Sequence, residues 1–151
     1  MQENKSPIGL ASDHAGFQMK EHIKRYLKSK DYSIIDYGTN SEESCDYPDF
    51  AHALAEGIEK GEVGNGIAVC GSGEGISIAL NKHQQIRAAL VWTPEIAKLA
   101  RQHNDANVLS LPGRFINEAT AEACVDNFLE TCFEGGRHEA RVKKIPVPGN
   151  K

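Results

Sequence analysis

The feature that most constrains the fold is a regular alternation between short apolar, β-forming runs and segments with helical spacing. The apolar runs predict strands at residues 7–12, 32–37, 67–70, 87–92 and 107–111. Helical segments follow them at residues 17–29, 48–58, 76–80, about 93–103 and 117–132. Five such repeats predict an α/β architecture: a three-layer Rossmann-like fold with a five-stranded parallel sheet and helices on both faces.

Two of the predicted helices also predict which side chains are buried. In segment 17–29 we expect the lysines on the face opposite an apolar stripe of Met19, Ile23, Tyr26 and Leu27. In segment 117–132, Cys124 and Cys132 both fall on the apolar stripe, so we expect both to be structural core cysteines. At the start of the predicted helix at about 93–103, Thr93 suits the N-cap and Pro94 suits the first turn.

Length and charge limit the classes of function. A chain of 151 residues that is 40% hydrophobic forms a single domain, here 1–151, and its net charge of −4 argues against nucleic acid as the main partner. The sequence has no apolar run near the 18 residues or so that a membrane span requires, and its first residues lack the apolar region of a signal peptide. We therefore expect a cytoplasmic protein, with no membrane partner and with its four cysteines as free thiols.

Residues 67–78 change from an apolar run to a glycine-rich loop and back to helical spacing. Glycines at 71, 73 and 75 let backbone N–H groups approach a ligand, and a helix start favours negative charge. The same field favours the thiolate form of Cys70, although a cysteine at a strand end also fits a purely structural role. Ile76 stands where the dinucleotide-binding fingerprint needs a small residue, and the Gly-Lys-Ser/Thr phosphate loop is absent.

Polar side chains follow three of the predicted strands at the point where each strand ends. Asp13 and His14 follow the first strand, residues 70–75 the third, and Arg114 the fifth. The carboxyl ends of parallel strands meet at one edge of the sheet, where such folds bind ligands. Each residue alone has a structural explanation, such as a helix cap for Asp13 or a surface ion pair for Arg114. Together they predict a site.

Two further segments are unusually polar. Residues 101–107 form a seven-residue connection, six of whose side chains can form hydrogen bonds. In the tail at about 133–151, Arg137 and Arg141 would share one face of a helix, with His138 beside them. Two guanidinium groups on one face suit a phosphate, although a solvated basic terminus is the alternative.

Four motifs, in order along the chain, resemble one enzyme family. They are Ala-Ser-Asp-His-Ala-Gly at 11–16, Cys-Gly-Ser-Gly-Glu-Gly-Ile-Ser-Ile-Ala at 70–79 with Asn81-Lys82, Arg-Gln-His-Asn-Asp-Ala-Asn-Val-Leu at 101–109 with Gly113-Arg114, and Gly-Gly-Arg-His at 135–138 with Arg141. A shorter one is Asp-Tyr-Pro at 46–48. The chain resembles the type B ribose-5-phosphate isomerases, within a group that includes galactose-6-phosphate and allose-6-phosphate isomerases.

The resemblance implies interconversion of D-ribose 5-phosphate and D-ribulose 5-phosphate through a cis-enediolate, in the pentose phosphate pathway, without metal or cofactor. It implies that Cys70 is the base, that Ser72 and the loop residues Gly71, Gly73, Glu74 and Gly75 surround the oxyanion, and that His103 opens the sugar ring with help from Asp13 and Tyr47. Asn104 would bind sugar hydroxyls. The phosphate ligands would be His14, Arg114, Arg137, His138 and Arg141.

The resemblance also implies a homodimer, or a dimer of dimers, with active sites shared between protomers through the 133–151 tail. Two departures from the family pattern matter little. Ser72 replaces a common threonine but keeps the hydroxyl, and Ile76 stands where a branch that lacks the cysteine carries a glutamate. The alternatives are a hexose-phosphate isomerase and a non-catalytic phosphate-binding module. A metal-dependent isomerase is disfavoured, because no paired-acid or H-x-x-x-H spacing supplies the ligands.

Overall fold

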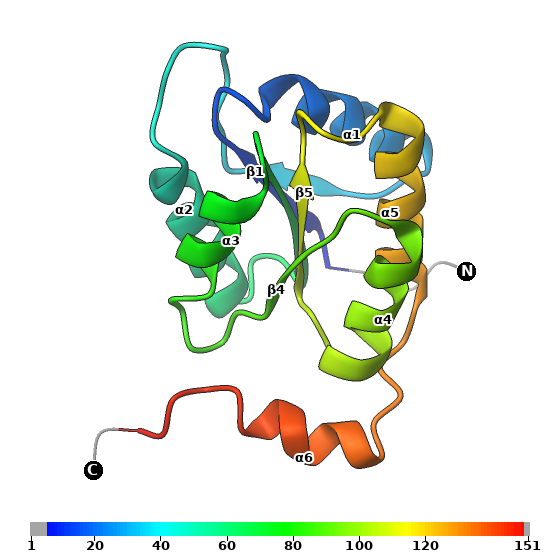
Figure 1. The fold of residues 1–151 in the computed structure, drawn as a ribbon. Helices are drawn as coiled ribbons and strands as arrows, with labels where there is room; N and C mark the ends of the chain where they lie inside the picture. The colour runs from blue at the N-terminus through cyan, green and yellow to red at the C-terminus, as the bar shows by residue number, and fades with distance from the viewer. Residues whose placement is uncertain (1–5, 150–151) are drawn as a thin grey trace.

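A computed structural model describes residues 6–149 of the chain. They form five strands and six helices in strict alternation until the end (Figure 1). The strands are β1 (Ile8–Ser12), β2 (Ile34–Asp36), β3 (Asn65–Cys70), β4 (Ala88–Leu90) and β5 (Val108–Pro112). The helices are α1 (Phe17–Ser29), α2 (Tyr47–Glu59), α3 (Glu74–Leu80), α4 (Pro94–Asn104), α5 (Glu118–Glu130) and α6 (Arg137–Lys143).

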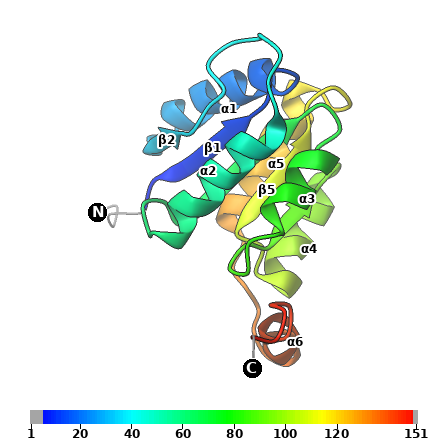
Figure 2. The ribbon, with the colours of Figure 1, turned by 90° about the vertical axis from the view of Figure 1, so that its left-hand side faces the viewer.

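The strands form one parallel sheet in the order β2-β1-β3-β5-β4. Helices α1, α4 and α5 pack together on one face, and α2 and α3 pack together on the other (Figure 2). The predicted three-layer α/β fold with a five-stranded parallel sheet is confirmed. Right-handed crossovers account for the arrangement, because connections that run in opposite directions along the sheet must cross opposite faces: β1 to β2 and β4 to β5 run one way, and β2 to β3 and β3 to β4 run the other.

Two apolar clusters fill the spaces between the layers. Phe128 of α5 and Leu10 of β1 belong to the cluster under α1, α4 and α5, whereas Leu54 of α2 and Ile76 of α3 belong to the other. All four side chains are fully buried. Alternate residues of the central strands supply the two clusters, as expected for a sheet that is covered on both faces.

The carboxyl edge of the sheet contains a topological switch point between β1 and β3. From β1 the chain continues through α1 to β2, and from β3 it continues through α3 to β4, on the other side. The two loops therefore diverge and leave room between them, which is where open α/β sheets bind ligands. Helix α6 lies at the opposite edge, beyond the end of α4 (Figure 1).

Three expectations about single elements are wrong. Lys20 faces inward and is fully buried, because it pairs with Asp36 at the end of β2. Cys132 is exposed, because α5 ends at Glu130 and the chain turns away. The 101–107 segment is not a long connection, since α4 continues through Asn104 before Asp105 adopts a left-handed conformation with φ 48°.

Other boundaries differ by a few residues. Strand β2 covers only residues 34–36, and α3 already begins at Glu74, so part of the glycine-rich segment is helical. Pro112 belongs to β5 instead of the following turn. The cap at Thr93 is present, with the Ile96 N–H donating to its hydroxyl oxygen at 3.3 Å. Within the described residues, no helix is long and apolar enough to cross a membrane.

Candidate active site

Cys70 ends β3 at the carboxyl edge, between the loops that follow β1 and β5. Cys70 is buried, with only 4% of its surface exposed to solvent. The turn after β5 is bonded to this strand end: the Gly113 N–H donates to the Cys70 carbonyl at 2.9 Å, and the Arg114 N–H donates to the Gly71 carbonyl at 3.0 Å. Arg114 is thereby fixed beside the glycine loop through the backbone.

The glycine loop joins β3 to α3 by close backbone approach. Gly73 is the N-cap of α3 and has φ 76°, a backbone conformation that residues other than glycine rarely adopt. A Cβ atom at Gly75 would lie 2.6 Å from the ring of Tyr47, so the absence of a side chain lets this ring rest on the first turn of α3. Ser72 is exposed, and its hydroxyl oxygen accepts the Glu74 N–H at 3.2 Å.

Asp13 and His14 form the loop after β1, and each has a defined partner. Asp13 is buried, and its Oδ1 accepts the N–H of Gly16, the N-cap residue of α1, at 3.0 Å, so it stabilises the turn before the helix and does not itself cap α1. The Cys45 N–H donates to Nδ1 of His14 at 3.2 Å, with the Cys45 Sγ 3.9 Å from the same nitrogen. An Nδ1 that accepts leaves the proton of the neutral ring on Nε2.

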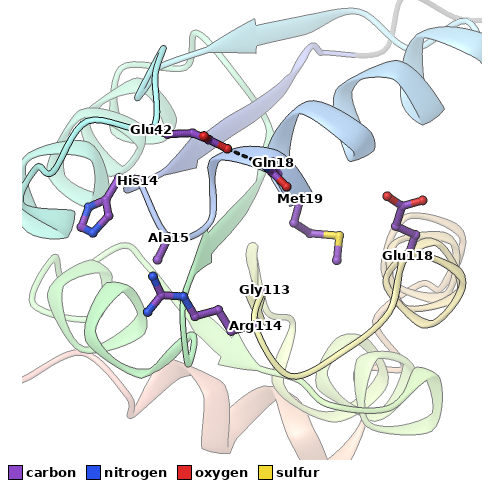
Figure 3. A pocket seen from close by; sticks show the side chains of 8 residues that line it. All are labelled: His14, Ala15, Gln18, Met19, Glu42, Gly113, Arg114 and Glu118. Atoms are coloured by element: carbon purple, nitrogen blue, oxygen red, sulfur yellow. Dashed lines mark hydrogen bonds between the residues drawn. The ribbon is translucent and has the colours of Figure 1, made fainter.

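A cleft of about 460 Å³ opens beside these loops (Figure 3). Figure 3 shows the guanidinium group of Arg114 passing Ala15 on the side where His14 lies, while Met19 and Glu118 line the far end. Gln18 of α1 donates a hydrogen bond to Glu42 across the rim. Arg114 and His14 therefore give the cleft a basic, donor-rich end, and the carboxylates of Glu42 and Glu118 belong to the same lining.

A second polar cluster lies at the amino edge of the same sheet. His103, near the end of α4, stacks on His138 of α6, with 4.3 Å between ring centroids and an interplanar angle of 14°. The Glu134 N–H donates to the Gln102 carbonyl at 3.1 Å, which holds the segment before α6 against α4. Asn104, Arg137 and Arg141 are exposed around this stack.

His138 is mostly buried, with 8% of the residue exposed. Desolvation lowers the pKa of its imidazole below the ordinary value of 6.5, and the nearby His103, Arg137 and Arg141 lower it further, against an opposing effect of Glu134. The ring is therefore neutral at pH 7. Together with the two exposed arginines it can donate hydrogen bonds to an anion.

Comparison with known proteins places the chain and its fold in one family. The profile of the family described as Ribose/Galactose Isomerase matches residues 8–145. The chain belongs to this family. Ribose-5-phosphate isomerase B of Escherichia coli is 44% identical over 138 residues, which cover 91% of this chain and 93% of that one.

Solved structures of the family superpose closely. A ribose 5-phosphate isomerase of Thermotoga maritima is 51% identical, with a TM-score of 0.92 over 93% of this chain and 97% of that one. Ribose-5-phosphate isomerase B from Mycoplasma genitalium, solved with bound ribulose-5-phosphate, is 42% identical, with a TM-score of 0.87 over 92% and 93% of the two chains.

The ribose/galactose isomerase fold of this chain divides the predicted site residues into two groups. The carboxyl edge holds Asp13, His14, Tyr47, Cys70, Gly71, Ser72, Gly73, Glu74, Gly75 and Arg114. The amino edge holds His103, Asn104, Arg137, His138 and Arg141. Strands of five residues at about 3.3 Å per residue separate the two edges by roughly 16 Å within one chain.

One group of side chains in the amino-edge cluster has the composition of a metal site. Ligand atoms of His103, Glu134 and His138 lie within 4.8 Å of one another. Two observations favour an anion there instead. The stacked rings hold their in-plane lone pairs in nearly parallel planes, so these lone pairs do not converge on one ion. Positive charge from Arg137 and Arg141 also acts on His138.

Several residues of the site were missed by the sequence reasoning. Gln18, Met19, Glu42 and Glu118 line the cleft. Cys45 holds His14 through its backbone, a contact that no side-chain pattern encodes. Its position directly before the Asp-Tyr-Pro motif at 46–48 is the one signal in the sequence that points to it.

Proposed function

We propose that this protein interconverts D-ribose 5-phosphate and D-ribulose 5-phosphate by proton transfer between C2 and C1. The observation that carries the proposal is Cys70, a thiol at the switch point of the sheet beside a glycine loop and a basic cleft. Membership of the ribose/galactose isomerase family, and a relative solved with ribulose-5-phosphate, support the choice of substrate.

In the proposed mechanism, Cys70 acts as a thiolate on the open-chain sugar. It takes the proton from C2, and the electron pair of that C–H bond forms the C1–C2 double bond of a cis-enediolate while charge moves to O1. Return of the proton to C1 gives the ketose, with a proton moving from O2 to O1. A base held next to the carbon acid supplies general base catalysis, and no oxidant or reductant is consumed.

The negative charge that develops on the enediolate needs donors already in position. The backbone N–H groups of the segment from Gly71 to Gly73 precede the first turn of α3, where N–H groups have no helical acceptor. Ser72 adds an exposed hydroxyl. Donors that are fixed before the reaction stabilise the transition state without reorganisation, which is the usual origin of the largest catalytic term.

We propose further that each active site combines two chains. In one protomer the full length of the strands, roughly 16 Å, lies between the edge that holds Cys70 and the edge that holds His103 and the arginines of α6, too far for both groups to act on one pentose phosphate. In a two-fold dimer the amino-edge cluster of one chain would face the carboxyl edge of the other, and the same contact would form twice. His103 of one chain would then open the sugar ring for Cys70 of the other, with Arg137 and Arg141 on the phosphate.

The test is an assay of purified protein with ribose 5-phosphate in the presence of EDTA, with ketose formation as the readout. We expect ribulose 5-phosphate to form and the C2 proton to exchange with solvent. Allose 6-phosphate and galactose 6-phosphate serve as competing substrates in the same assay. If only a hexose phosphate is turned over, the protein is a hexose-phosphate isomerase of the same family. If sugar phosphates bind but none is turned over, the protein is a non-catalytic phosphate-binding module.

A further inference from the structure

A fully buried lysine lies at the start of a chain of contacts that ends at His14. The Lys20 side chain has no exposed surface, and its Nζ lies 2.6 Å from the Asp36 Oδ2. A buried ammonium group costs folding free energy unless it is paired, so a lysine at this position needs an explanation beyond helix propensity. The contacts beyond Asp36 supply one.

Asp36 uses its two carboxylate oxygens for different tasks. Oδ2 receives Lys20 and Lys24, each at 2.6 Å, and Oδ1 accepts the Gly38 N–H at 2.9 Å. Burial by itself would raise the pKa of Asp36, but the two ammonium groups and the Gly38 amide outweigh burial, so the pKa is lowered. Asp36 is thus an ionised carboxylate that ties α1 to the first residue of the loop formed by residues 38–46.

The 38–46 loop is fastened to the segment that carries Asp13 and His14. The Ser12 N–H donates to the Gly38 carbonyl at 2.7 Å, and the Thr39 N–H donates to the Ser12 carbonyl at 2.8 Å. Near the other end of the loop, the Cys45 N–H donates to Nδ1 of His14 at 3.2 Å. The loop therefore touches the β1 end twice, once before Asp13 and once at the His14 ring.

We propose that Lys20 and Asp36 are positioning residues that select the tautomer of His14 through the 38–46 loop. With Nδ1 held as an acceptor, the neutral ring presents Nε2–H as a donor for an anionic group in the cleft, beside Arg114. The inference rests on the proposed function, because the family resemblance makes His14 and Arg114 ligands of the phosphate of the sugar substrate. Without this chain of contacts, His14 would sample both tautomers and part of its donor strength would be lost.

Two variants interrupt the chain at opposite ends. Lys20→Met/Asp36→Leu removes both members of the buried pair and leaves Lys24 paired with Glu21, whereas Cys45→Pro removes the N–H that His14 accepts together with the nearby thiol. Cys45→Ala keeps that N–H and is the matched control. Tyr26→Phe is the control for general loosening of α1, because it removes the 2.6 Å hydrogen bond from Tyr26 to Asp126 and leaves every contact of Asp36 in place.

Three measurements decide whether Lys20 and Asp36 position His14 or only stabilise the fold. Imidazole ¹⁵N resonances report the tautomer of His14, titration with inorganic phosphate reports anion binding, and steady-state kinetics separate KM from kcat. In both test variants we expect His14 to become a mixture of tautomers. We expect phosphate affinity to fall and KM for ribose 5-phosphate to rise by about tenfold, the effect of losing one hydrogen bond to a charged group, with a smaller change in kcat.

The proposal is overturned if the test variants keep a single Nε2–H tautomer and the affinity of the native protein for phosphate. It is also overturned if Tyr26→Phe changes the His14 resonances as much as the test variants do. If the double variant does not fold, Lys20→Met/Asp36→Asn is measured in its place, because it also removes both buried charges but keeps a side chain of the same shape at residue 36. A protein without isomerase activity refutes the proposed function, while the ¹⁵N spectra and phosphate titration still decide this inference.

Discussion

At the residue scale, the four cysteines differ because their environments differ. Cys70 lies at a strand end beside the cleft, Cys45 in the loop against His14, Cys124 in the core under α5 and Cys132 at the exposed end of α5. Burial raises the pKa of the Cys124 thiol to about 11, so this residue is neutral at any physiological pH. Of these thiols, the proposed chemistry concerns Cys70 alone.

We predict that Cys70→Ala lowers turnover by about 10² to 10⁴, the usual contribution of a general base, without a change in fold. Cys132→Ser is the matched control, because its side chain is exposed and outside both clusters. Iodoacetamide should inactivate the native protein, substrate should protect it, and mass spectrometry should find Cys124 unmodified. Near-native turnover of Cys70→Ala would refute its role as the base.

Ring opening and proton transfer should respond separately to a change at His103. We predict that His103→Asn impairs turnover of the cyclic sugar but largely preserves exchange of the C2 proton in a linear substrate analogue, because only ring opening needs an acid–base group at the ring oxygen. Steady-state assays and proton exchange followed by NMR compare the two substrates. An equal loss on both would show that His103 serves the enediolate or the structure instead.

At the scale of elements, α6 is held by few contacts. It packs against α4 through the stack of His138 on His103 and through the segment before it, and most of its seven residues are exposed. Short helices of this kind depend on tertiary contacts, because isolated helices of this length do not persist in water. Protonation of the buried His138, which stacks on His103, should therefore weaken the attachment of α6 to α4.

The pKa of His138 gives the direction of this effect. Burial first, and then positive neighbours, lower this pKa below 6.5 in the folded protein, so detaching α6 takes up a proton as the pH falls. The attachment should be fully stable above pH 6.5 and weaken as the pH drops below that value toward the lowered pKa. Hydrogen exchange of α6 amides between pH 7.5 and 5, with β3 amides as internal reference, measures the effect.

A matched substitution sharpens this test. Glu134 lies 3.8 Å from His138 Nε2, and its charge acts to raise the pKa of the imidazole. Glu134→Gln should lower the pKa of His138 further and increase α6 exchange at a given acidic pH. Protection factors of the α6 amides that are the same at pH 7.5 and pH 5 in both proteins would mean that His138 does not control the attachment of α6.

At the scale of the whole molecule, one sheet carries unlike groups at its two ends. The carboxyl edge has the thiol, the glycine loop and the basic cleft, and the amino edge has the histidine stack with the α6 arginines. Exposed apolar side chains lie near the carboxyl edge, where the Trp92 and Phe115 rings are 5.6 Å apart. A surface of this kind suits contact with another protein chain.

Complementation between inactive chains tests the proposed dimer. We predict that a Cys70→Ala chain and an Arg137→Ala/Arg141→Ala chain, each inactive alone, regain activity after subunit exchange, because one site of each heterodimer receives both intact halves. Native mass spectrometry verifies heterodimer formation before the assay. If each mutant chain is folded and the verified heterodimers remain inactive, the base and the phosphate ligands belong to the same chain.

Much of this architecture could be predicted from the sequence, because it depends on local pattern. Apolar periodicity places the strands and helices within a few residues, and the start of the helix after Thr93 follows from its capping chemistry. The gathering of Asp13, Cys70 and Arg114 at one edge follows from parallel strands alone, since their carboxyl ends coincide.

Other features depend on which partner lies opposite, and only the tertiary structure decides that. The sequence pattern predicts a solvated Lys20, and only the pairing of β2 with β1 brings Asp36 to it. The backbone of Cys45 reaches His14 only because the 38–46 loop folds back over the end of β1. The separation of His103 and α6 from Cys70 depends on the length of the sheet and the path of the tail. Periodicity reports that a position faces inward, but the contact it makes there is long-range, and folding of the whole chain fixes it.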